Sequence, residues 1–191
     1  MGELIRFVSS HEVGHTLGLR HNMGASSATP VEKLRDKEYQ RLNGHTSSIM
    51  DYARFNYVAQ PEDGVKHLFP RIGDYDKWAI KWGYTYTGVG DEADKKINNK
   101  WIVDALSAND RVWFGGEGYN ADPRAQTEDL GDNAVLASEY GIKNLKRIIT
   151  QLPEWTKEET DKYENLGQMY MQLVGQYNRY MNHVAKNIGG V

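Results

Sequence analysis

The chain has 191 residues, of which 39% are hydrophobic and 26% are charged, which is enough for a domain with a buried core. The formal net charge of −3 offers no basic surface, so no nucleic-acid partner is expected. No apolar run reaches the roughly 18 residues that a membrane helix needs, so no transmembrane segment is expected. The absence of cysteine excludes disulfides, thiol nucleophiles and cysteine-ligated zinc sites.

The first half of the sequence predicts three helices. Gly18 is expected to end the first helix, whose inner face carries Leu4, Val8, His11 and His15. A second helix is expected over residues 29–43, opened by a capping box and a proline, with inward-facing Val31, Leu34 and Leu42. A third helix is expected from Asp74 to Trp82, whereas residues 45–70 show little periodicity and are expected to be irregular.

The second half predicts two long antiparallel helices. Residues 97–106 indicate a helix, residues 111–114 a short strand, and residues 115–118 a turn. Apolar residues then form two helical stripes on either side of Pro153, and a capping box at Thr156 is expected to open the last helix. The first stripe carries Leu136, Tyr140, Leu145, Ile149 and Leu152. The second stripe, expected in the core, carries Tyr163, Leu166, Tyr170, Leu173, Tyr177, Tyr180, Val184 and Ile188.

One segment of the sequence has the spacing of a metal site. Residues 11–21 read His-Glu-Val-Gly-His-Thr-Leu-Gly-Leu-Arg-His. His11 and His15 are four residues apart, so a helix places both imidazoles on one face, where they can bind one zinc ion. A sharp turn at Gly18 can bring His21 back to the same ion. Because three protein ligands leave a fourth position open, the sequence predicts a catalytic Zn²⁺ centre.

Glu12 follows the first histidine and is placed to reach a water on the metal rather than the metal itself. Zinc lowers the pKa of its bound water and polarises a substrate carbonyl. Glu12 is therefore expected to act as the general base and then to pass the proton to the leaving amine. The predicted activity is that of a zinc-dependent endopeptidase, which hydrolyses peptide bonds through a zinc-bound water without a covalent intermediate.

The pattern His11-Glu12-x-x-His15-x-x-Gly18-x-x-His21 resembles the zinc signature of the metzincin metallopeptidases, HExxHxxGxxH. Residues 48–52, Ser-Ile-Met-Asp-Tyr, resemble the methionine-containing turn of that family, the Met-turn. The resemblance implies that Met50 forms a hydrophobic floor beneath the histidines without binding the metal. It also implies a catalytic role for Tyr52, which would hydrogen-bond the transition state. Read alone, Met50 would more often be a core residue, and Tyr52 a core aromatic with its hydroxyl satisfied.

The resemblance extends to domain organisation. Residues 74–84 resemble the helix that closes metzincin catalytic domains, so residues 1–85 are expected to form a metzincin-like catalytic subdomain and residues 86–191 a helical extension. The layout is similar to that of large secreted bacterial metzincin-like proteases, which implies a secreted, periplasmic or cell-surface location in a bacterium.

The resemblance also implies that the fold is mainly α within an α+β parent. Metzincins place a twisted sheet before the active-site helix, and no such strands precede that helix in this sequence. The chain is therefore expected to be the C-terminal part of the catalytic domain followed by the extension, with its active-site helix partly exposed. The expected partners are a peptide or protein substrate and the missing N-terminal part of the same protein.

Other polar residues are weaker candidates. The histidines at 45, 67 and 183 have no partner at ligand spacing, so His45, His67 and His183 are expected in surface or capping roles. Glu128, Asp129 and Asp132 suggest calcium, but their spacing differs from a calcium loop and favours a charged helix start. Arg20 is expected to lie in solvent.

Two classes of function remain open at this point. The first is the zinc endopeptidase, and the second is a non-catalytic helical protein-interaction module with a vestigial or structural zinc site. An intact Glu12 favours the enzyme, because a binding module has no use for a general base. Zinc-dependent hydrolysis of a non-peptide substrate also fits the ligands. Peptide specificity and oligomeric state do not follow from the sequence.

Overall fold

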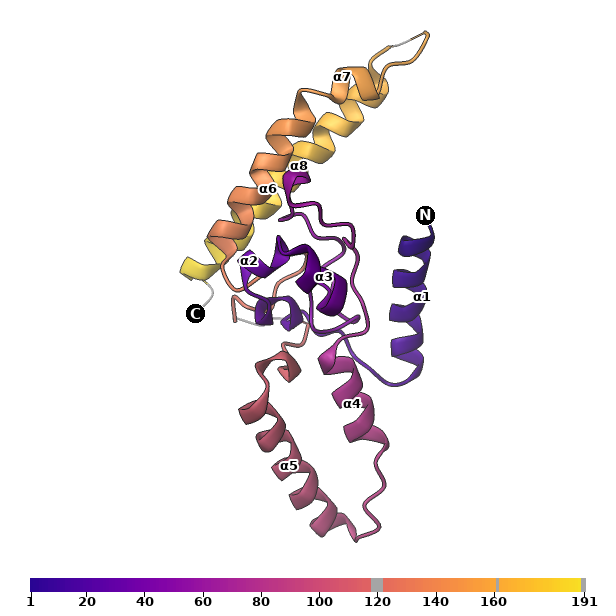
Figure 1. Cartoon of the computed structure of the whole chain (residues 1–191), viewed down its shortest axis with the longest axis vertical. Coiled ribbons are helices and arrows are strands. Elements are labelled where there is room, and N and C mark those ends of the chain that lie inside the picture. Colours follow the sequence, from indigo (N-terminus) through magenta and orange to yellow (C-terminus); the bar gives the residue numbers. More distant parts are fainter. Residues whose placement is uncertain (118–121, 161, 190–191) are drawn as a thin grey trace.

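The computed structural model describes residues 1–117, 122–160 and 162–189, and it is mainly helical, as the sequence predicts (Figure 1). The α-helices are α1 (Gly2–Thr16), α2 (Val31–Leu34), α3 (Lys37–Asn43), α4 (Asp74–Tyr84), α5 (Asp91–Ala108), α6 (Ala134–Ile149), α7 (Leu152–Trp155) and α8 (Glu164–Gly189). Short 3₁₀ helices are η1 (Ala25–Ala28), η2 (Pro61–Asp63) and η3 (Asp110–Val112). Within the described ranges, none of these helices is long and apolar enough to cross a membrane.

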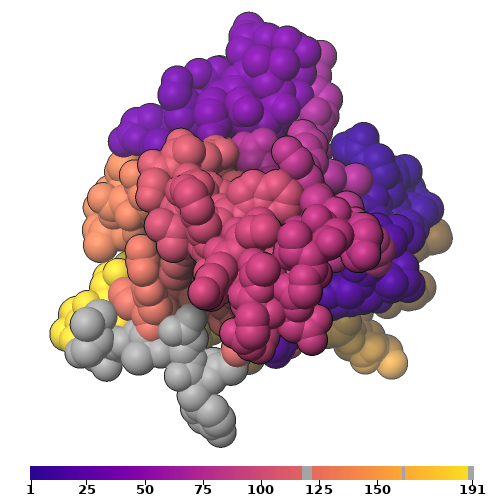
Figure 2. Space-filling model, turned by 90° about the horizontal axis from the view of Figure 1, so that it is seen from below, coloured from indigo at the N-terminus to yellow at the C-terminus, as the bar shows by residue number. Residues whose placement is uncertain are grey.

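The helices surround a central region of short helices and irregular chain. Helices α6 and α8 form the expected long antiparallel pair on one side of it, while α4 and α5 extend from the opposite side (Figure 1). Figure 2 shows α4 and α5 covering the face seen from below, with α1 beside them. The predicted irregular stretch at residues 45–70 lies in the centre and contains only the short helix η2.

The hydrophobic core joins the two halves of the chain. Residues from the first 60 positions pack against the α6–α8 pair, and the core consists of Val31, Leu34, Ala53, Tyr57, Val58, Leu130, Ala137 and Tyr180. The rings of Tyr57 and Tyr180 lie 4.7 Å apart between centroids. Leu136, Tyr140 and Leu145 of the predicted first stripe pack against this core. The long helices therefore hold the central region by direct burial of apolar surface.

The second predicted helix is divided in two. Helix α2 ends at Leu34, and Asp36 then caps α3, because its carboxylate accepts hydrogen bonds from the backbone N–H groups of Glu38 and Tyr39. This break rotates the second segment, so Leu42 is 65% exposed and not inward-facing as predicted. Val31 and Leu34 are buried as expected.

Residues 111–114 do not form the predicted strand. Arg111 and Val112 belong to η3, because the side chain of Asn109 accepts from Arg111 N and starts a tight helical turn, and residues 113–114 have no regular structure. The guanidinium of Arg111 donates to Asp74 at 2.6 Å, and to Thr29 and Tyr39, which fixes η3 against the start of α4. Helix α5 begins at Asp91, six residues before the predicted start.

The last helix also differs from the sequence prediction. Thr156 does not cap it, because its hydroxyl donates to the carbonyl of Leu152 and ends α7 instead. Helix α8 starts at Glu164, and of the predicted core stripe only Tyr180 is buried. The largely exposed members of that stripe are Tyr163, Tyr170, Tyr177 and Ile188. Helix α8 is longer than the core against which it packs, so most residues of the stripe lie beyond that core.

Candidate metal centre

Helix α1 presents two of the predicted ligands one turn apart. His11 and Gly14 are the buried residues of this helix, and His15 lies on the same face. The helix ends as predicted, because Gly18 adopts φ +83°, a left-handed conformation that side chains disfavour. The chain reverses there, and Leu19 N donates back to the carbonyl of Gly14 at 3.0 Å. This reversal returns His21 to the face that carries the other two histidines.

The three histidines form one cluster. One ring nitrogen from each of His11, His15 and His21 lies within 4.8 Å of the others. In the described part of the chain, this is the single group of three or more histidine or acidic side chains close enough to share a metal ion. The structure therefore brings together the three residues that the spacing indicated.

Each histidine is oriented through its Nδ1 atom. Nδ1 of His11 donates to the carbonyl of Ile49 at 2.8 Å, and Nδ1 of His15 donates to the carbonyl of Leu19 at 3.0 Å. Nδ1 of His21 lies 2.6 Å from a carboxylate oxygen of Glu117. Because carbonyl and carboxylate oxygens accept, each Nδ1 carries a proton, and in the neutral rings Nε2 has a free lone pair. This pattern is typical of histidines that bind a metal through Nε2.

The arrangement of the Nε2 atoms fits a zinc ion. Nε2 of His15 and Nε2 of His21 lie 3.0 Å apart, although in the neutral rings neither has a proton to share. Two nitrogens bound to one tetrahedral zinc ion at about 2.0–2.1 Å stand about 3.4 Å apart, which is close to this separation. Burial also lowers the pKa of His11, which favours the neutral ring that a metal ion requires.

The segment that resembles a Met-turn lies directly beneath α1. Residues Ile49 and Met50 form a tight turn, and Met50 is completely buried. Asp76 of α4 holds this turn, because its carboxylate accepts from Ser48 Oγ at 2.6 Å and from Ile49 N at 2.7 Å. The Met50 sulfur lies against Gly14, between the two histidines of the helix. The turn therefore supports the helix and also supplies the carbonyl of Ile49 that orients His11.

Tyr52 and Glu12 lie beside the cluster. The Tyr52 ring stacks on His11 at 5.6 Å between centroids and lies 4.5 Å from the ring of His21. Glu12, His11 and Tyr52 line a hollow of about 440 Å³, whose other walls are mainly apolar and aromatic: Leu4, Phe7, Val8, Arg54, Phe55 and Phe69. This hollow opens at the histidine cluster and can take an apolar side chain.

Helix α1 is partly exposed, as expected. Leu4, Ile5, Val8 and Val13 are between 42% and 59% exposed, and a second apolar hollow lies between α1 and α4. The buried residues of α1 are His11 and Gly14, which contact Ile49 and Met50 in the turn at residues 48–51. Arg20 is exposed, as predicted.

The weaker candidates lie outside the cluster. His45 is completely buried, which corrects the expected surface or capping role, and burial lowers its pKa to about 4. His183 is also buried, which corrects the same expectation, and its ring donates to the carbonyl of Thr127. His67 contacts Arg71. The charged helix start favoured for Glu128, Asp129 and Asp132 does not form, because α6 begins at Ala134 and has no acidic residue in its first turn. Glu128 pairs with Arg54 and Arg179, and Asp132 accepts from Val31 N. Asp129 is buried, not part of a charged helix start.

Sequence reasoning missed Glu117 and Asn22. Both lie in segments with loop-like composition. Glu117 belongs to the turn expected at residues 115–118, whose last residue, Gly118, lies outside the described residues. The contact between Glu117 and His21 joins residues 96 positions apart, so it can be recognised only from the folded structure. The one signal in the sequence is the glycine pair at 115–116, which permits close backbone approach.

Comparison with known protein families agrees with this geometry. A family model described as Met-zincin matches residues 1–191. The chain belongs to the Met-zincin family. Comparisons of this Met-zincin with curated proteins and with solved structures gave no match. The histidine cluster and the family together indicate a zinc metallopeptidase-like function.

Proposed function

We propose that this Met-zincin is a zinc-dependent endopeptidase. His11, His15 and His21 would hold the metal, with Met50 as the floor of the site and residues 86–191 as a helical extension of a catalytic subdomain at 1–85. The observation that carries the proposal is the convergence of three imidazoles, each fixed through Nδ1, on one point beside Glu12. A bound zinc ion would lower the pKa of a coordinated water and polarise the scissile carbonyl.

Glu12 supplies the acid–base chemistry in this proposal. It lines the same hollow as His11 and lies on the exposed side of α1, where an attacking water can reach its carboxylate. Glu12 takes a proton as the water attacks the carbonyl carbon and delivers it to the amine nitrogen as the peptide bond breaks. The ring of Tyr52 flanks His11 and His21, which supports a catalytic role in which its hydroxyl would hydrogen-bond the oxygen on which negative charge develops.

A peptide substrate would bind beside Glu12 and His11. The aromatic hollow beside Glu12 accepts one side chain next to the scissile bond, and burying it contributes binding free energy of about 1.5–3 kcal/mol. By its resemblance to large secreted bacterial metzincin-like proteases, we propose a secreted, periplasmic or cell-surface location.

The proposal is tested with Glu12→Gln, which keeps the shape of the side chain and removes the base. In the full natural form of the protein, the wild type is expected to bind zinc and to cleave peptides from a quenched fluorescent library, whereas the variant binds zinc equally and cleaves at least about 10²-fold more slowly. Glu3→Gln is the matched control, because Glu3 lies on the same helix and pairs only with Arg6 among the described contacts. A full natural form that binds zinc but cleaves no library peptide would favour the protein-interaction module.

A further inference from the structure

Glu117 reaches the third histidine from a distant part of the chain. Its Oε2 atom lies 2.6 Å from His21 Nδ1, across 96 residues of sequence. The other two histidines lie on α1 and use backbone carbonyls from neighbouring turns. His21 lies beyond the end of α1, in a segment without regular structure. Its ring therefore has no helix to set its direction, and Glu117 provides the restraint.

The segment that carries Glu117 is fixed to the backbone next to His21. Asn22, which is completely buried, donates through its side-chain nitrogen to the carbonyl of Trp113 at 2.9 Å and accepts from Gly115 N at 2.9 Å. Gly24 N donates to the carbonyl of Gly115 at 3.1 Å, and Asn22 forms an isolated β-bridge with Gly116. These contacts place Glu117 beside His21.

Glycine is required for this close approach. A Cβ atom at Gly24 would overlap the ring of Trp113, and one at Gly115 would stand 2.9 Å from the Cα of Gly24. Asn22 N also donates to the carbonyl of Met50 at 3.1 Å, so the same residue joins the 113–116 segment to the turn beneath the cluster. The contact of Glu117 with His21 is thus part of a connected set of hydrogen bonds.

We propose that Glu117 is a positioning residue that orients His21 and strengthens metal binding, an inference that rests on the proposed zinc site. A carboxylate on the outer nitrogen of a ligand histidine fixes the ring and increases the electron density at the ligating nitrogen. The side chain of Glu117 is 47% exposed, so solvent screens its charge, and the directional hydrogen bond carries most of the effect. The region after residue 85 then completes the metal centre.

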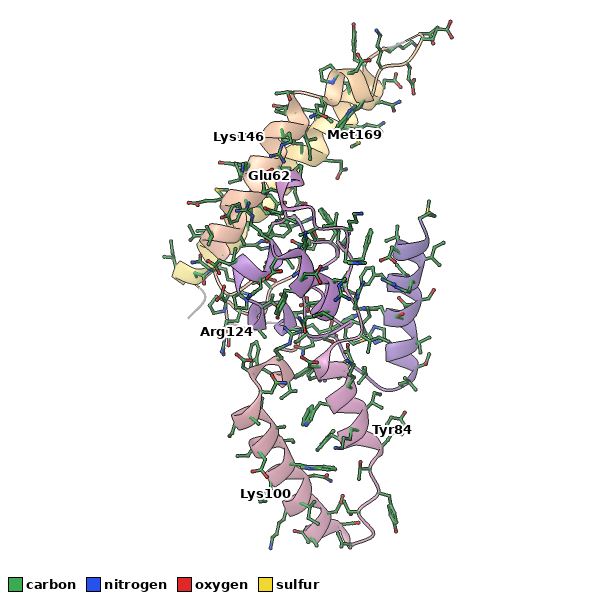
Figure 3. All side chains as sticks on the ribbon, viewed as in Figure 1. Glu62, Tyr84, Lys100, Arg124, Lys146 and Met169 are labelled. Carbon is green, nitrogen blue, oxygen red and sulfur yellow. The ribbon has the colours of Figure 1, made fainter. Side chains whose placement is uncertain are left out.

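The test measures zinc affinity by competition with a chromophoric chelator, using the full chain. Glu117→Ala is expected to weaken zinc binding by about 10–100-fold, the usual effect of losing an outer partner of a ligand histidine. Glu117→Gln retains an acceptor oxygen and is expected to lose clearly less. Glu62→Gln is the matched control, because Glu62 is 52% exposed, pairs with Lys143 and Arg147, and lies beside α6, apart from α1 (Figure 3). Its zinc affinity is expected to equal that of the wild type.

A second measurement separates positioning from a general structural role. The thermal unfolding midpoint in the presence of EDTA is expected to be the same, within about 2 °C, for the wild type, Glu117→Ala and Glu62→Gln. Glu117→Ala that binds zinc within about twofold of the wild type would overturn the inference and leave the proposed zinc site intact. The inference would also be overturned if Glu117→Ala lost zinc affinity and its unfolding midpoint in EDTA fell as well, because the residue would then have a general structural role. A wild-type chain that binds no zinc would overturn both proposals.

Discussion

Met50 fills the space that a side chain on Gly14 would need. A Cβ atom built on Gly14 would lie far inside van der Waals contact with the Met50 sulfur, and Met50 is completely buried. Gly14 stands between Glu12 and His15 on α1, so the packing of one methionine sets how closely the helix approaches the turn at 48–51. The spacing of the proposed metal ligands depends on that approach, because the carbonyl of Ile49 in the turn orients His11.

Gly14→Ala is expected to destabilise the chain although alanine favours a helix. The gain in helix propensity is about 1 kcal/mol, whereas the overlap with Met50 costs about 1–3 kcal/mol. Gly175→Ala on α8 is the matched control, because a Cβ atom there meets nothing within 4 Å. Urea unfolding is expected to show a loss for Gly14→Ala and a gain of about 0.5–1 kcal/mol for Gly175→Ala. Equal gains for both variants would contradict the packing described.

A double-mutant cycle tests the same contact from both sides. Met50→Ala alone is expected to cost about 2–5 kcal/mol, because it leaves a cavity in a fully buried site. Once Met50 is truncated, Gly14→Ala no longer meets the sulfur and is expected to become neutral or stabilising. The unfolding free energies of the four proteins should therefore be non-additive by more than about 1 kcal/mol. Additive costs would show that the two residues do not interact.

Asp51 gives the chain a distinctive pH dependence. Burial raises the pKa of Asp51 to about 8 from the usual 3.8, although Ser26 N and Thr46 Oγ1 donate to its carboxyl group. Between about pH 4 and 8 the folded chain holds a proton that the unfolded chain releases. This one group therefore lowers the free energy of unfolding as pH rises, by up to about 1.4 kcal/mol per pH unit.

Asp51→Asn keeps an oxygen for both donors and removes the titration. We expect the variant to match the wild type near pH 4 and to be more stable near pH 8, measured by urea unfolding in EDTA. The comparison with the wild type cancels the titration of the histidines. Stability curves that run parallel across this range would show that Asp51 is not a buried acid with a raised pKa.

Asp76 links α4 to the turn beneath the metal centre. Asp76→Ala removes the acceptor of Ser48 Oγ, Ile49 N and Gly73 N, and each buried donor left unpaired costs about 1–3 kcal/mol. Because Ile49 orients His11, we also expect weaker zinc binding. Asp76→Asn, which retains an acceptor oxygen, should lose less on both measures. An unchanged zinc affinity in Asp76→Ala would show that the turn held by Asp76 does not influence metal binding.

Local signals in the sequence predicted the parts of the molecule that local interactions determine. The four-residue spacing of His11 and His15, and the left-handed Gly18 that follows, are properties of one helix and its end. The long α6–α8 pair also followed from its periodicity. In contrast, the strand expected at 111–114 does not form: Arg111 lies in η3, where it contacts Asp74, Thr29 and Tyr39.

The features that the sequence did not predict depend mainly on contacts between segments that are distant in the sequence. One local signal was also missed: Asp36 divides the helix expected at 29–43, since its side chain accepts from Glu38 N and Tyr39 N and caps α3. Glu117 follows a glycine pair and carries no periodic signal, so its contact with His21 depends on the amide of Asn22. Buried His45 and Asp129 are likewise set by packing around them and not by their neighbours in sequence.

Zinc K-edge X-ray absorption on the purified chain tests the central claim most directly. The account predicts one zinc ion per chain with three imidazole nitrogens and one further light atom at about 2.0–2.1 Å. It also predicts that His21→Ala reduces the imidazole count from three to two, whereas replacing the buried His45 with Gln leaves it unchanged. A chain that binds no zinc, or a zinc environment whose imidazole count does not change in His21→Ala, would contradict it.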